Sequence, residues 1–254
     1  MSHVITGYAP VNGLKMYYEV HGAGRPLVLL HGGLLTIDLS FGDLLPGLAN
    51  SRQVIATELQ GHGRTADIDR DIDLRYLAGD VAALLDHLGV DQADVLGFSL
   101  GGGVALQLTL DHRGRVGRII LASVSYASDG MHAEISDPAQ HATSTRMPTE
   151  DDFRQMREAY ARLAPDPSHF DAFAAKATRA VSSLKGWTAE ELGSITAPTL
   201  LVFGDHDFIR LEHAVQMHGL IPGAQLAVLP GATHMGVLRR TDLILPLVSG
   251  FLRD

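Results

Sequence analysis

The chain contains no cysteine, and basic residues are outnumbered by acidic ones. Without cysteine it can form no disulfide bond and perform no thiol chemistry, and we expect a reducing, cytoplasmic location. The 29 acidic and 20 basic residues give a net charge of −9, which repels nucleic acid and anionic lipid surfaces. We therefore expect neither a nucleic-acid partner nor a membrane partner.

Long hydrophobic runs are also absent. No run approaches the roughly 18 apolar residues that a membrane-spanning helix needs, and residues 1–20 lack the pattern of a signal peptide. The 254 residues are 46% hydrophobic and 19% charged, which is an ordinary globular composition. A chain of this length and composition buries a real core, and we expect one large domain with an insertion.

Short β-rich runs are spread along most of the chain, and each ends at a glycine, a proline or a polar residue. The first two are joined by Val11-Asn12-Gly13, which predicts a hairpin. The later ones are continuously apolar, which indicates strands buried on both faces of a parallel sheet. The expected strands are residues 3–9, 14–20, 27–30, 53–57, 94–98, 118–123, 199–203 and 225–229.

Helical patterns alternate with these strands. Apolar residues at steps of three and four predict a helix over residues 74–88, and Gly89 ends it. Residues 99–112 form a second helical pattern and residues 243–252 a third, in which Pro246 requires a late start or a kink. The alternation predicts an α/β fold with a mostly parallel central sheet and helices on both of its faces.

Residues 126–195 interrupt this alternation. They show no convincing strand pattern, contain four prolines and include amphipathic stretches at 149–163 and 168–184. We expect a small helical cap insertion at 126–195 within a core made of residues 1–125 and 196–254.

A polar serine stands where a strand meets a helix in the run DVLGFSLGGGVAL, residues 94–106. Gly97 and Gly101 flank Ser99, as a sharp turn requires, because larger side chains there would collide with neighbouring backbone. Such a turn raises the Ser99 hydroxyl at the carboxyl edge of the sheet, where open α/β folds bind ligands. The helix N-terminus beside it favours negative charge.

A serine hydroxyl becomes a nucleophile only when a base takes its proton and a third group orients that base. His234 follows the strand predicted at 225–229 and supplies an imidazole. Asp205 and Asp207 follow the strand predicted at 199–203, and either one can supply the orienting carboxylate.

Acyl transfer also creates an oxyanion, which preset N–H donors stabilise. The glycine-rich loop His31-Gly32-Gly33 follows the strand at 27–30 and can offer one donor near Ser99. The backbone N–H of Leu100 can offer the other.

Five short motifs along the chain each follow a predicted strand. They are His31-Gly32-Gly33, Gly61-His62-Gly63-Arg64-Thr65, Gly97-Phe98-Ser99-Leu100-Gly101-Gly102, Gly204-Asp205-His206-Asp207 and Gly231-Ala232-Thr233-His234. With them the chain resembles α/β-hydrolase-fold serine hydrolases, the group of esterases, lactonases and cofactor-free haloperoxidases, over essentially its whole length.

The resemblance implies a role for each site residue. Ser99 would be the nucleophile, His234 the base and Asp207 the orienting acid, while Gly33 and Leu100 would form the oxyanion hole. The chain departs from the family at Glu58 and Thr65, where aspartate and serine are common, and we expect structural consequences only.

The resemblance further implies hydrolysis of a small, fairly apolar carboxylic ester or lactone through an acyl-enzyme, without a cofactor. Relatives that attack with an aspartate, the haloalkane dehalogenases and epoxide hydrolases, are excluded by Ser99. Three alternatives stay open: a cofactor-free haloperoxidase or perhydrolase, a carbon-carbon bond hydrolase, and a non-catalytic ligand-binding member of the fold.

In the family, an insertion in the place of residues 126–195 forms a cap over the nucleophile. Candidates for substrate contact are Leu34, Tyr126, Met131, Met156, Tyr160, Phe208 and Met235. We expect no metal site, because the histidines and aspartates near residues 205–213 match no metal-binding pattern.

The expected partner is a small-molecule substrate, and the sequence leaves open whether the protein is a monomer or a homodimer.

Overall fold

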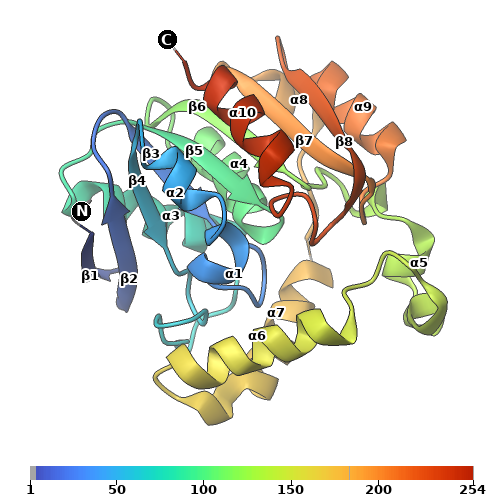
Figure 1. The fold of residues 1–254 in the computed structure, drawn as a ribbon, viewed down its shortest axis with the longest axis horizontal. Coiled ribbons are helices and arrows are strands. Elements are labelled where there is room, and N and C mark those ends of the chain that lie inside the picture. Colours follow the sequence, from blue (N-terminus) through green and yellow to red (C-terminus); the bar gives the residue numbers. More distant parts are fainter. Residues whose placement is uncertain (1–3, 183, 254) are drawn as a thin grey trace.

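The computed structural model describes residues 4–182 and 184–253. They form one eight-stranded sheet in the order β1-β2-β4-β3-β5-β6-β7-β8, with helices on both faces (Figure 1). Pairs involving β1 and β2 are antiparallel, and the remaining five pairs are parallel. The predicted α/β fold is therefore confirmed. The strands are β1 (Ile5–Val11), β2 (Leu14–His21), β3 (Pro26–Leu30), β4 (Gln53–Thr57), β5 (Ala93–Phe98), β6 (Val116–Ala122), β7 (Thr199–His206) and β8 (Gln225–Thr233).

The bounds of β1, β7 and β8 differ most from the predicted ones. β1 begins at Ile5 and runs to Val11, while the predicted start at residue 3 lies outside the described residues. β7 and β8 continue past residues 203 and 229, because a register shift between Gly204 and His206 lets their pairing resume. Pro230 is tolerated inside β8, since β8 is an edge strand and a proline there breaks no inner ladder.

Successive side chains of the central strands enter two separate cores. In β5, for example, Val95 belongs to one core and Leu96 to the other, as the period of two in a strand requires. The first core includes side chains of α3 (Leu74–His87), α4 (Leu100–Asp111), α8 (Ala189–Gly193) and α9 (Leu211–Leu220). The second includes side chains of α1 (Ile37–Phe41), α2 (Leu45–Leu48) and α10 (Thr241–Phe251). The sheet is thus buried on both sides.

The helix predicted at 243–252 is α10, which begins at Thr241 and contains Pro246. The possibility that this helix starts only at the proline is therefore wrong. The helix continues through the proline, whose missing N–H leaves the carbonyl of Asp242 without its usual partner. Among the described residues, no helix is both long and apolar enough to span a bilayer.

The chain between β6 and β7 is mainly helical. It contains η1 (Ser128–Gly130), α5 (Ala133–Ser136), η2 (Pro138–Thr143), α6 (Glu150–Leu163), η3 (Pro167–His169) and α7 (Phe170–Ser182), followed by α8. Figure 1 shows α6 and α7 next to each other and apart from the sheet. An isolated β-bridge joins Met131 to Ile209, and the prediction of no strand in this segment missed it. The predicted helix at 168–184 includes residue 183, which lies outside the described residues, and the cap boundaries 126–195 stay a prediction.

Candidate active site

Ser99 occupies the sharp turn between β5 and α4. Its φ of 52° and ψ of −116° are unusual for a residue with a side chain, and such strain clusters at functional sites. A Cβ on Gly97 would lie 2.3 Å from the carbonyl oxygen of Gly101, and one on Gly101 would lie 2.1 Å from that of Leu30. The two glycines are therefore required by backbone crowding, as predicted.

Three side chains from separate strand ends meet at this turn. The Nε2 atom of His234 lies 3.0 Å from the Oγ atom of Ser99, and its Nδ1 atom lies 2.7 Å from Oδ1 of Asp207. A carboxylate only accepts hydrogen bonds, so Nδ1 carries the proton and the lone pair of Nε2 faces the Ser99 hydroxyl. His234 is 5% exposed and Asp207 is fully buried, so water hardly competes for these contacts.

The carboxylate of Asp207 is held by several donors. It accepts hydrogen bonds from the Ser123 hydroxyl at 2.5 Å, from the N–H of Phe208 at 2.6 Å and from the N–H of Gly204 at 3.3 Å. Burial is the largest influence on its pKa and acts to raise it, but the electrostatic interaction with His234 and these hydrogen bonds together outweigh burial. The pKa of Asp207 is therefore lowered, and the group is ionised at neutral pH.

The competing carboxylate, Asp205, has different partners. It lies 2.8 Å from Nδ1 of His206 and accepts a hydrogen bond from the N–H of Ala232 at 3.2 Å. Its side chain is 34% exposed. Of the two aspartates that the sequence left open, Asp207 is the one that contacts His234.

The loop that carries Gly33 lies beside the start of α4. A Cβ on Gly33 would be 3.8 Å from the Cβ of Leu100, an ordinary van der Waals distance, so the loop packs beside the Leu100 side chain. The His31 ring braces this loop by donating from Nδ1 to the carbonyl of Gly32 and accepting at Nε2 from the N–H of Leu59. Burial lowers the pKa of His31 to about 4, which keeps the ring neutral and able to accept.

Of the candidates for substrate contact, the structure brings Phe208 directly against the site. Its ring stacks on the His234 ring with centroids 3.9 Å apart and planes 4° apart. Tyr126 stacks instead on His213 at 4.1 Å, and Tyr160 packs against Phe170 and Phe173.

The remaining candidates have apolar surroundings. Leu34, Met156 and Met235 pack in the core that includes Phe98, the residue before the nucleophile position, and Met131 forms the bridge to Ile209. Contact of any candidate with substrate stays a prediction.

The two departures from the family pattern hold the loop after β4. Buried Glu58 accepts from the N–H of Arg64 at 2.6 Å and pairs with its guanidinium at 2.8 Å. Burial raises the pKa of Glu58, although the bonds and charge of Arg64 partly oppose it. The Thr65 hydroxyl donates to the carbonyl of Glu58 and accepts from the N–H of Tyr17. Their contacts are structural, as expected.

Two residues near the site were missed in the sequence. Ser123, which donates to Asp207, follows β6 with a φ of 56°, so a polar residue at a strand end was an available signal. Arg146 donates from Nη1 to the carbonyl oxygen of Asp207 at 2.9 Å and pairs with Glu134 at 2.9 Å. No sequence pattern marks Arg146, because it lies far from Asp207 along the chain.

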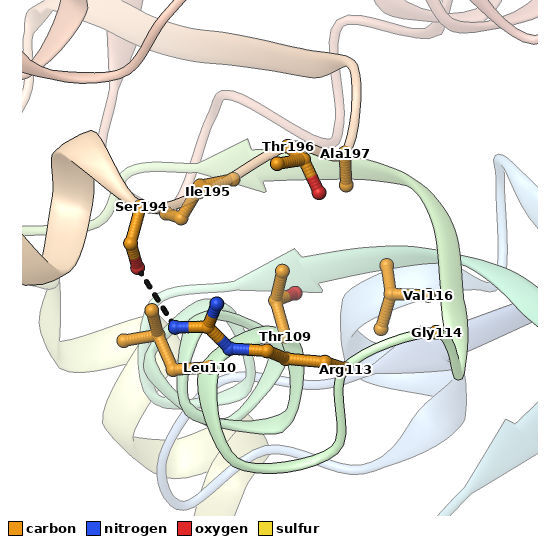
Figure 2. Close-up of a pocket in the computed structure, with 9 residues that line it drawn as sticks. All are labelled: Thr109, Leu110, Arg113, Gly114, Val116, Ser194, Ile195, Thr196 and Ala197. Atoms are coloured by element: carbon orange, nitrogen blue, oxygen red, sulfur yellow. Dashed lines mark hydrogen bonds between the residues drawn. The ribbon is translucent and has the colours of Figure 1, made fainter.

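Two cavities lie away from these residues. One of about 40 Å³ is enclosed by the end of α4 and residues 194–197, where Arg113 donates to the Ser194 hydroxyl (Figure 2). It has room for a few water molecules only. A groove of about 380 Å³ lies between β2, α1 and α2. Within residues 4–182 and 184–253, no group of three or more His, Asp or Glu side chains is arranged to hold a metal ion.

Comparison with known sequences identifies relatives that match nearly the whole chain and one that matches about half of it. The 2-hydroxymuconate semialdehyde hydrolase of Pseudomonas sp. (strain CF600) is 30% identical, over 95% of this chain and 92% of that protein. The non-heme haloperoxidase of Rhodococcus erythropolis is 27% identical, over 88% and 90%. A soluble epoxide hydrolase of Corynebacterium sp. (strain C12) is 38% identical over only 48% of this chain and 42% of that protein.

Solved structures show the same fold. A 2-hydroxy-6-oxo-6-phenylhexa-2,4-dienoate hydrolase from Rhodococcus sp. strain RHA1 superposes with a TM-score of 0.80 at 22% identity, over 100% of both chains. Est816, an N-acyl homoserine lactone degrading enzyme, superposes with a TM-score of 0.72 at 26% identity, over 98% of this chain and 100% of Est816. The model of the alpha/beta hydrolase fold family matches residues 25–170, more than half of the chain. The chain therefore belongs to the α/β-hydrolase fold family, as its motifs indicated.

Proposed function

We propose that this protein is a serine hydrolase that cleaves a small, fairly apolar carboxylic ester or lactone. The observation that carries the proposal is the contact of 3.0 Å between Ser99 Oγ and His234 Nε2, with Asp207 hydrogen-bonded behind the imidazole. A buried imidazole with an ionised carboxylate behind it can take the proton of a serine hydroxyl.

The reaction would proceed in two halves. Ser99 Oγ attacks the acyl carbon while its proton passes to Nε2 of His234, and the N–H groups of Gly33 and Leu100 stabilise the oxyanion. His234 then protonates the leaving oxygen, and an acyl-enzyme forms as the carbon–oxygen bond breaks. A water molecule attacks the acyl carbon, gives its proton to His234, and the proton returns to Ser99 Oγ as the acid leaves.

Two findings support an ester or lactone. Est816 acts on an N-acyl homoserine lactone and is similar to this chain over almost its full length. Apolar Phe208 stacks on His234, and the residues that follow Gly33 and His234 in the chain, Leu34 and Met235, are also apolar. Epoxide opening is disfavoured despite the short match to an epoxide hydrolase, since Ser99 stands where an attacking carboxylate would be needed.

A second candidate is the hydrolysis of a carbon–carbon bond. It is favoured by the relative of 30% identity, a 2-hydroxymuconate semialdehyde hydrolase that this chain matches over 95% of its residues. The proposed Ser99, His234 and Asp207 could serve either reaction, so the substrate decides between them.

A panel of substrates tests the proposal. Purified protein and its Ser99→Ala variant are given p-nitrophenyl acetate and butyrate, N-acyl homoserine lactones, and 2-hydroxymuconate semialdehyde. Acetate with hydrogen peroxide tests perhydrolase activity. We expect the fastest turnover with esters or lactones and a loss of about 10⁴-fold or more in Ser99→Ala, because the three residues act as a unit.

The other outcomes are equally informative. Faster turnover of 2-hydroxymuconate semialdehyde would replace the ester or lactone by the second candidate. Ester turnover that survives unchanged in Ser99→Ala would remove Ser99 from the reaction altogether.

A further inference from the structure

Phe208 makes an unusually close contact with His234. The two rings lie nearly parallel, 4° apart, with centroids 3.9 Å apart, so the benzene face covers the imidazole face. Phe208 is half-buried, whereas His234 is 5% exposed. A side chain in this position limits the rotation of the imidazole and shields one of its faces.

The backbone around Phe208 fixes where its ring lies. Its N–H donates to Oδ1 of Asp207 at 2.6 Å, and its carbonyl oxygen accepts from the N–H of His132 at 2.9 Å. The preceding carbonyl, that of Asp207, accepts from Arg146 at 2.9 Å. Both peptide groups that flank Phe208 are thus anchored, so the ring is placed by the same contacts that place the carboxylate.

We propose that Phe208 is a positioning residue for the reaction, acting through His234, and this inference rests on the proposed function. The face of a benzene ring carries negative electrostatic potential and attracts a cation placed over it. In the proposed reaction His234 takes the proton of Ser99 and becomes an imidazolium. The attraction therefore strengthens in the transition state, which is the kind of interaction that raises kcat.

The competing role for Phe208 is direct contact with the substrate. A side chain that binds the substrate equally in the ground state and the transition state changes KM and leaves kcat alone. A positioning residue does the opposite. The split between kcat and KM therefore separates the two roles.

The experiment compares Phe208→Leu with Phe208→Tyr in the wild-type protein's best ester reaction. Leucine keeps an apolar side chain but removes the π face, while tyrosine retains the face. We expect kcat to fall about tenfold in Phe208→Leu with little change in KM, and to be largely restored in Phe208→Tyr. Phe153→Leu, at a 48%-exposed ring on α6, is the matched control and should keep full activity.

A spectroscopic measurement makes the test independent of turnover. In protein with isotopically labelled histidine, the ring current of Phe208 should shift the carbon-bound imidazole protons of His234 upfield, with the assignment made from His234→Asn. The upfield shift should disappear in Phe208→Leu and persist in Phe208→Tyr. These spectra also report whether the variant is folded.

Each outcome bears on one proposal. Full kcat in Phe208→Leu, or a raised KM with unchanged kcat, overturns the positioning role even if the protein is an esterase. Unshifted His234 protons in the wild type also overturn it. If the wild type turns over no ester or lactone but hydrolyses 2-hydroxymuconate semialdehyde, the proposed function fails, and the same comparison of kcat and KM on that substrate supports or overturns the positioning role.

Discussion

The turn at Ser99 and the segment at Asp207 are held in place by different means. Ser99 is fixed by backbone crowding, since Gly97 and Gly101 leave no room for even a methyl group. Asp207 is fixed by hydrogen bonds from side chains and backbone, among them Ser123 and the distant Arg146. The first arrangement depends on close backbone contacts within the turn and with Leu30 at the end of β3, whereas the second depends on hydrogen bonds that include side chains from remote parts of the chain.

The two parts of the site should respond differently to substitution. A substitution in the turn should damage folding, because a clash with backbone cannot be relieved by rotating a side chain. A substitution around Asp207 should damage catalysis first, because the carboxylate has several donors and the loss of one leaves the fold in place.

The largest effect is expected at the carboxylate itself. Asp207→Asn should lower kcat by about 10⁴-fold, since an amide no longer holds His234 in the required tautomer. Asp205→Asn, which changes a carboxylate bonded to His206 and Ala232, should cost less than tenfold by comparison. Steady-state kinetics of both variants on one ester give the measurement. The reverse order would assign the orienting role to Asp205.

The next effect concerns the turn. Gly101→Ala would place a Cβ 2.1 Å from the carbonyl oxygen of Leu30, and we expect a loss of roughly 1–3 kcal/mol of unfolding free energy or more. Gly79→Ala is the matched control, because no atom lies within 4 Å of a Cβ at that helical position. It should raise stability by about 0.5–1 kcal/mol. Urea denaturation measures both, and equal stabilities would contradict the crowding argument.

The smallest effect is expected at Arg146. Arg146→Ala removes the donor to the carbonyl of Asp207, and we expect kcat to fall roughly 2- to 10-fold with unchanged KM and little loss of stability. Arg154→Ala, on an exposed part of α6, should leave the kinetics as they are. An Arg146→Ala protein that keeps full kcat would show that Asp207 needs no support from Arg146.

Much of the fold and of the site could be predicted from the sequence, because the signals there are local. Continuous apolar runs revealed the central strands, and the glycines around Ser99 revealed the turn. The strand-end positions of His234 and Asp207 allowed their meeting to be anticipated, since the carboxyl ends of parallel strands share one edge of the sheet.

The rest depended on contacts that no local pattern encodes. The extension of β7 and β8 follows from a register shift between the two strands, which is a property of the pair. Phe208 was one of the candidates for substrate contact, and its stacking on His234 depends on how the segment after β7 folds back. Arg146 reaches Asp207 across 61 positions of sequence, a distance that spacing arguments do not cover.

The most direct test of the account is the reactivity of the Ser99 hydroxyl. Wild-type protein is treated with a fluorophosphonate, digested and examined by mass spectrometry, alongside Ser99→Ala and His234→Asn. We predict a single phosphonylated peptide that carries the label on Ser99, no label in Ser99→Ala and strongly slowed labelling in His234→Asn. Labelling on another residue, or equal rates with and without the imidazole, would contradict the central claim that His234 activates Ser99.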